Sequence, residues 1–276
     1  MKKLLCFCLL FYGMTIYAQE KENTVVKTER QQKSSVEPSH QKMKMTRGDV
    51  KIIEATENIR YLSQKIAKEY LFFYTYPNNT EMKKSLYRSL KKLGENLQII
   101  SAVTKDEDTS NILEFLAYSK EEILTIINKK PTSGQAVLML DYSETLLEGA
   151  DSIGRTYAYA FSKEEKMLVN AKNVKYLLER IVKYYMALYH GYNRENNQKN
   201  LEEAIENLVS YLGELNRYAY PKKIQNARSK IDIVWERDKE ILKSIDRYFI
   251  PSLLFDSVVY MEDKIDILAL YHSQNL

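Results

Sequence analysis

Two segments decide the expected fold of this 276-residue chain: NIRYLSQKIAKEY at residues 58–70 and NVKYLLERIVKYY at residues 173–185. Six of the thirteen aligned positions are identical, and four more keep charge or shape. In the first segment Ile59, Leu62 and Ile66 have the three-and-four spacing that places one apolar stripe along a helix. Helical periodicity alone does not reproduce Asn, Tyr and Lys at matched places, so we interpret the pair as a tandem duplication.

The match continues in the same order beyond these two segments, with four extra residues in the turn of the second copy. The further aligned pairs are residues 93–95 with 212–214, 122–124 with 240–242, and Glu148 with Glu262. We therefore expect each copy to be a unit of four helices.

The rest of the chain has a helical composition, since eight glycines and five prolines are few for this length. Three pairs with the spacing of capping boxes or close variants mark helix starts: Thr132 with Gln135, Ser162 with Glu165, and Asn200 with Glu203. The expected helices cover about 49–75, 81–103, 109–129, 133–160, 163–192, 201–218, 221–247 and 251–272. Short connections make successive helices antiparallel, so we predict an all-α fold of two tandem antiparallel four-helix bundles.

The apolar stripes predict the residues of the two cores. In the first bundle they are Ile59, Leu62, Ile66, Leu97, Leu116, Ile123, Leu140 and Leu147. In the second bundle they are Val174, Leu177, Ile181, Leu208, Leu212, Ile241, Leu254 and Met261.

The N-terminus has the pattern of a secretory signal peptide. Lys2 and Lys3 precede an apolar run over residues 4–17, and Ala18 follows it, so we expect residues 1–18 to be removed. The run is short for a membrane span, and no later stretch approaches the required length, so we expect no transmembrane segment after signal removal. The protein is expected to be periplasmic or secreted.

The segments after the signal peptide differ in composition. Residues 19–48 are polar and mixed in charge, which is typical of a flexible tether. We expect residues 49–160 to form the first bundle and residues 161–276 to form a second, divergent one.

Several classes of function find no support in the sequence. Removal of the signal peptide leaves 39 basic and 37 acidic residues, a balance that does not favour nucleic-acid binding. The chain has no HExxH, GxSxG, Walker or GxGxxG motif, and its single Glu-x-x-His spacing, at residues 37–40, lies in the tether and contains a proline. We therefore expect no catalytic residue, no metal site and no cofactor.

Residues 60–68, RYLSQKIAK, resemble the helix-one signature of the type IV pili methyl-accepting chemotaxis transducer N-terminal domain, the PilJ/NarX-type sensor domain. That signature is usually written R-M-L-S-Q-R-M-A-K, and six of its nine residues are present here. The second copy keeps a weaker form, with Lys175 in the place of the arginine and Leu178-Glu179 in the place of Ser-Gln. The resemblance implies a periplasmic four-helix sensor bundle that commonly forms a homodimer. In nitrate-sensing members, the helix-one arginine contacts the anion at the dimer seam.

Arg60 is therefore the first candidate for binding a small anion or an acidic group of a partner. Ser63 and Gln64 lie three and four residues further along the helix, so we expect them near Arg60 as hydrogen-bond donors. Lys175 is the equivalent cation in the second copy. Its ammonium is a point charge, whereas a guanidinium is a planar group with several donors, so we expect weaker anion binding there.

The leading hypothesis is an exported, sensor-like binding module that is not an enzyme and that acts through a separate envelope or signalling protein. The alternative is a structural or envelope-interaction protein in which the bundles are spacers and docking faces without a small ligand. An enzyme of unrecognised type is the third hypothesis.

Overall fold

The computed structural model describes residues 47–245 and 247–276, and in these residues the backbone forms eight α-helices and no strand. The helices are α2 (Arg47–Thr75), α3 (Thr80–Val103), α4 (Glu107–Ile127), α5 (Ser133–Thr156), α6 (Lys163–Tyr189), α7 (Arg194–Arg217), α8 (Lys222–Lys243) and α9 (Pro251–Gln274). The all-α prediction is confirmed. The expected signal peptide, and the expected tether up to residue 46, lie outside the described residues.

The helix starts follow local hydrogen bonding at two of the three predicted caps. Thr132 accepts a hydrogen bond from the Gln135 amide, and Ser162 forms a reciprocal capping box with Glu165. The start predicted at Asn200 is wrong, because α7 begins at Arg194 after Asn193. Residues 194–200 contain no aliphatic side chain that would have signalled helical periodicity.

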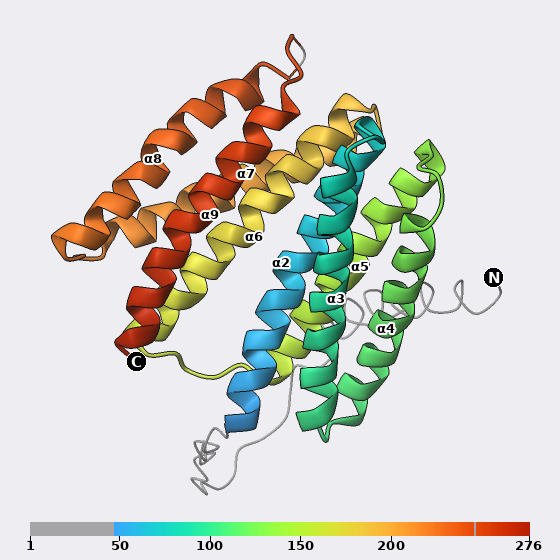
Figure 1. Cartoon of the computed structure of the whole chain (residues 1–276). Helices are drawn as coiled ribbons and strands as arrows, with labels where there is room; N and C mark the ends of the chain where they lie inside the picture. Colours follow the sequence, from blue (N-terminus) through green and yellow to red (C-terminus); the bar gives the residue numbers. More distant parts are fainter. Residues whose placement is uncertain (1–46, 246) are drawn as a thin grey trace, which may run out of the picture. The chain divides into compact units, whose positions relative to one another are not determined.

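The packing order follows the chain, with one main packing contact between its two halves (Figure 1). In the first half α2 packs on α3 and α5, and α4 packs on both α3 and α5. In the second half α6 packs on α7 and α9, and α8 packs on α9. The two halves meet where α2 packs against α6, a contact here called the seam. Among the described residues, no helix combines the length and apolar character needed to cross a membrane.

Helices α2 and α6 are enclosed on several sides, because each packs mainly on two helices of its own half and on one of the other. Residues 66–73 of α2 and 181–188 of α6 are buried without a break. The predicted core residues are buried, except that Leu140 and Ile241 are only partly buried. Leu140 is less covered because it lines a cavity.

A close approach of α4 and α5 gives the first test of this packing. A Cβ atom at Gly149 would lie 2.6 Å from Cδ2 of the fully buried Leu116, whereas a Cβ at Gly134 would meet nothing within 4 Å. We expect Gly149→Ala to lower the free energy of unfolding by about 1–3 kcal/mol through overpacking. Gly134→Ala, the matched control, should leave it equal or slightly higher. Urea unfolding measures both, and equal stability of the two variants would contradict the α4–α5 contact.

Candidate functional site at the α2–α6 seam

Matched contacts between cations and aromatic rings cross the seam in both directions. The guanidinium of Arg60 on α2 lies 4.7 Å from the ring centroid of Tyr176 on α6. The ammonium of Lys175 on α6 lies 5.3 Å from the ring centroid of Tyr61 on α2. These four residues occupy equivalent places in the two matched segments, so one type of contact is used twice.

Each of the two cations also has a carboxylate partner on the last helix of its own half. Arg60 Nε lies 2.7 Å from Asp151 on α5, and Lys175 Nζ lies 2.7 Å from Asp266 on α9. Arg60 Nη1 additionally lies 3.0 Å from Glu57 and donates to the Asn173 side-chain oxygen at 2.8 Å. These contacts hold the guanidinium group of Arg60 in a fixed orientation.

Deeper in the seam, charged groups are removed from water altogether. Lys68 on α2 and Glu179 on α6 have no exposed side-chain surface, and their charged atoms lie 2.5 Å apart. Lys65 Nζ lies 3.2 Å from the same carboxylate and 3.8 Å from Glu262 on α9. The Tyr61 hydroxyl donates to Glu262 at 3.0 Å.

The two buried carboxylates differ in protonation. Burial by itself would raise the pKa of Glu179, but Lys68 and Lys65 outweigh it and lower the pKa to about 2. Burial, reinforced by the charge of Glu179, raises the pKa of Glu262 to about 7, and the charges of Lys65, Lys68 and Lys175 only partly offset this rise. Glu179 is thus ionised at neutral pH, whereas Glu262 is close to its midpoint.

Arg60, the arginine of the sequence motif, lines a small polar cavity of about 180 Å³. Arg60 from α2 and Arg180 from α6 both line it, and their guanidinium carbons lie 4.7 and 6.0 Å from the ring centroid of Tyr176. Asn207 and Tyr211 of α7 complete the polar wall. We call this space the Arg60–Arg180 cavity.

Ser63 and Gln64 are fully buried and link the two arginines. The Ser63 hydroxyl donates to the Arg60 carbonyl oxygen at 2.7 Å, and the Gln64 amide donates to the Ser63 hydroxyl at 2.9 Å. Arg180 Nη1 donates to the Gln64 side-chain oxygen at 3.3 Å. The pair therefore supports the arginines through a hydrogen-bond chain rather than by presenting exposed donors.

The sequence did not single out Arg180 as a candidate, although the alignment of the two segments pairs it with Lys65. Arg180 Nη1 lies 3.0 and 2.9 Å from the two carboxylate oxygens of Glu144 on α5. Lys175, which was selected, lies instead with Asp266 and Tyr61. The change from Lys65 in the first segment to Arg180 in the second is the sequence feature that could have indicated this residue. A guanidinium, unlike an ammonium, offers a planar set of donors.

No family model matches the chain, and neither does any curated protein or solved structure. The family resemblance of residues 60–68 stays a prediction based on the motif. Within residues 47–245 and 247–276, no three His, Cys, Asp or Glu side chains come together as a metal ion would require.

The buried pair of Lys68 and Glu179 supplies a test of the seam. Glu179→Leu leaves the buried ammonium of Lys68 without its carboxylate partner, so it should lower the free energy of unfolding by about 3–5 kcal/mol. Lys68→Met leaves Glu179 paired with Lys65 alone, so its loss should be smaller. The double variant should recover much of that loss, because both buried charges are then gone. Urea unfolding of the full cycle measures the coupling, and additive single losses would show that the two side chains do not interact.

The protonation of Glu262 predicts a pH dependence of stability. Its pKa is about 7 in the folded state and near 4.5 when unperturbed, so between these values the folded state holds a proton that the unfolded state has released. The free energy of unfolding should therefore fall as pH rises from about 4.5 to 7. Glu262→Gln should flatten that part of the profile, whereas exposed Glu148→Gln should not. An unchanged slope in Glu262→Gln would contradict the assignment.

Proposed function

We propose that this chain is an exported, non-catalytic helical binding module that takes up a small anion, or an acidic group of a partner, in the Arg60–Arg180 cavity. Its architecture is two tandem antiparallel four-helix bundles, α2–α5 and α6–α9, and it acts through a separate partner protein. The observation that carries the proposal is the convergence of two guanidiniums from α2 and α6 on one polar cavity.

The tandem architecture is supported by packing and by matched contacts. Helices α2–α5 form a closed set of neighbours, and α6–α9 repeat the contacts of first helix with second, first with fourth, and third with fourth. The crossed contacts of Arg60 with Tyr176 and of Lys175 with Tyr61 relate the two halves through equivalent residues.

The choice of an anion rests on the donors that remain on Arg180. The hydrogen bonds of Arg180 in the described structure leave from Nη1, toward Gln64 and Glu144, so Nε and Nη2 keep donors for a ligand. Asp151 and Glu144 hold the guanidiniums of Arg60 and Arg180 in place, and they compete with a ligand for the positive charge. Glu203 also lines the cavity, and its negative charge opposes an anion, so only a small ligand that accepts strongly from both guanidiniums would bind there.

The resemblance of residues 60–68 supports the same site. It implies that the arginine at position 60 contacts an anion at a seam between two helix-one segments. In this chain the two matched helices, α2 and α6, pack within one molecule. The homodimer that the resemblance also implies is a separate expectation, which sedimentation velocity of the mature protein tests.

Calorimetry tests the site directly. Nitrate, nitrite, sulfate and acetate are titrated into the mature protein, and at least one should bind. Arg60→Gln and Arg180→Gln should each weaken binding roughly tenfold to a hundredfold, the loss expected for one charge-assisted hydrogen bond. Lys175→Gln should have a smaller effect, because Lys175 contacts Tyr61 and Asp266 instead.

Arg88→Gln is the matched control, since Arg88 is exposed on α3 and the change removes the same charge. Thermal melting of every variant shows whether a loss of binding follows a loss of fold. Equal anion binding by wild type and both cavity variants, or no binding at all, would contradict the proposal.

A second candidate function, interaction without a small ligand, is favoured by an apolar stripe on α9. Leu253, Tyr260, Ile267 and Leu270 recur at helical spacing and are 39–58% exposed. A structural or envelope-interaction protein would use such a face to dock. This hypothesis takes the lead if the titrations show no anion binding.

A further inference from the structure

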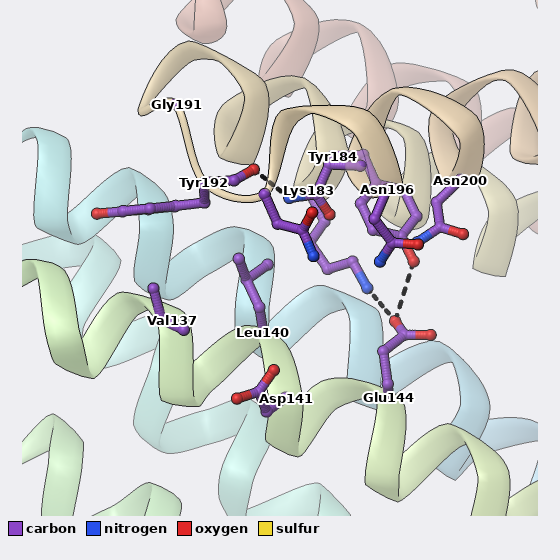
Figure 2. A pocket seen from close by; sticks show the side chains of 12 residues that line it. Val137, Leu140, Asp141, Glu144, Lys183, Tyr184, Gly191, Tyr192, Asn196 and Asn200 are labelled. Carbon is purple, nitrogen blue, oxygen red and sulfur yellow. Dashed lines mark hydrogen bonds and ion pairs between the residues drawn. The ribbon is translucent and has the colours of Figure 1, made fainter.

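A second cavity, of about 330 Å³, lies between α5 and the start of α7, with the α6–α7 turn at its rim (Figure 2). Its α5 wall consists of four residues on one helix face: Val137, Leu140, Asp141 and Glu144. Its opposite wall carries four amides with the same spacing on and just before α7: Asn193, Asn196, Asn197 and Asn200. We call this space the asparagine cavity.

The charges at the base of the asparagine cavity are already paired with one another. Lys183 is fully buried and bonds to Glu144, as Figure 2 shows, and it donates to the Ser143 hydroxyl at 3.2 Å. Glu144 also accepts from the Tyr184 hydroxyl at 3.2 Å and pairs with Arg180. Within this paired group an anion would be opposed by Glu144 and a cation by Lys183. The carboxylate of Asp141 on the α5 wall adds an acceptor for hydroxyl groups of a ligand.

The upper wall offers neutral hydrogen-bonding groups instead. Each asparagine amide carries one acceptor oxygen and two donor hydrogens. Asn197 is buried and donates to the Tyr192 carbonyl oxygen at 2.6 Å, which fixes the turn. Asn196 and Asn200 stand on the wall of the cavity in Figure 2, where their amides are available to a ligand.

The apolar parts of the cavity lie close to these amides. Val137 and Leu140 present aliphatic groups, and Tyr184 and Tyr192 present rings. A ligand with hydroxyls around its edge and C–H groups on its faces satisfies both kinds of surface. A saccharide has that distribution, and the volume lies at the lower end of the range for small-molecule sites.

The matched half of the molecule shows why the space is open here. Lys68, the equivalent of Lys183, lies 4.0 Å from the ring centroid of Phe255, which packs on Phe72 at 5.2 Å. The residue four places beyond Lys183 is Ala187, where α2 has Phe72. Lys68 is thus covered by Phe255, whereas Lys183 lies 4.2 Å from the ring centroid of Tyr184 and also borders a cavity.

The rim has an unusual backbone. Gly191 has φ +72°, and Asn193, with φ +32°, is the one non-glycine residue with positive φ in the described part of the chain. The left-handed region of backbone conformation is unfavourable for residues other than glycine, and asparagine is among the residues that tolerate it best. This conformation places Asn193 before α7 without a side-chain cap and brings the turn over the cavity.

We propose that the asparagine cavity is a second ligand site, which takes an uncharged polyhydroxylated molecule such as a mono- or disaccharide. Asn196 and Asn200 bind its hydroxyls, and Leu140 contacts its C–H face. The paired charges of Lys183 and Glu144 form a polar base without selecting a charged ligand.

Ligand-observed NMR and calorimetry on the mature chain test this site with glucose, N-acetylglucosamine, maltose and cellobiose. At least one should bind. Asn196→Leu and Asn200→Leu should each weaken binding roughly tenfold, the loss expected for a hydrogen bond made by a neutral group. Leu140→Trp should abolish binding by filling the cavity, while thermal melting shows that the variant is folded.

Asn207→Leu is the matched control, because Asn207 lies on the same helix but lines the Arg60–Arg180 cavity. It should leave saccharide binding unchanged, and so should Arg60→Gln, which keeps this test independent of the anion site. Absence of binding by all four sugars would overturn the proposal. So would equal binding by wild type, Asn196→Leu and Asn200→Leu.

Discussion

The ion pair of Lys68 and Glu179 constrains the arrangement of the two halves more than any other contact at the seam. Both side chains are fully buried and their charged atoms lie 2.5 Å apart. Separating them would leave Lys68 without its carboxylate partner in the interior and Glu179 with Lys65 alone, at a cost of several kcal/mol. Helices α2 and α6 are therefore held in one register, and the crossed contacts of Arg60 with Tyr176 and of Lys175 with Tyr61 depend on that register.

The same register brings one carboxylate between the two cavities. Glu144 pairs with Arg180, which lines the Arg60–Arg180 cavity, and with Lys183, which lines the asparagine cavity. An anion on Arg180 would share that guanidinium with Glu144, whose other partners are Lys183 and Tyr184. The two proposed sites are separate in their ligands but share a structural support.

Much of the fold is readable from the sequence because apolar spacing and caps are local. The three-and-four stripe of Ile59, Leu62 and Ile66 predicts both the helix and its buried face. The start of α7 was missed because its first turns are polar. The site was only partly predictable: Arg60 was chosen from a motif, but its approach to Arg180 depends on the packing of α2 against α6, which the periodicity of one helix does not encode.

The matched halves also diverge in a way that alignment alone conceals. The sequence pairs Glu148 with Glu262, yet Glu148 is exposed, whereas Glu262 is buried and lies 3.8 Å from Lys65. In the first half Glu144, one helical turn before Glu148, takes the equivalent role by pairing with Arg180, the counterpart of Lys65. A partly buried cation needs a carboxylate within reach but does not fix which turn of the neighbouring helix supplies it. That freedom lets a duplicated pair of helices keep its charge pairing while the space beside Lys68 is filled by Phe255 and the space beside Lys183 is left open.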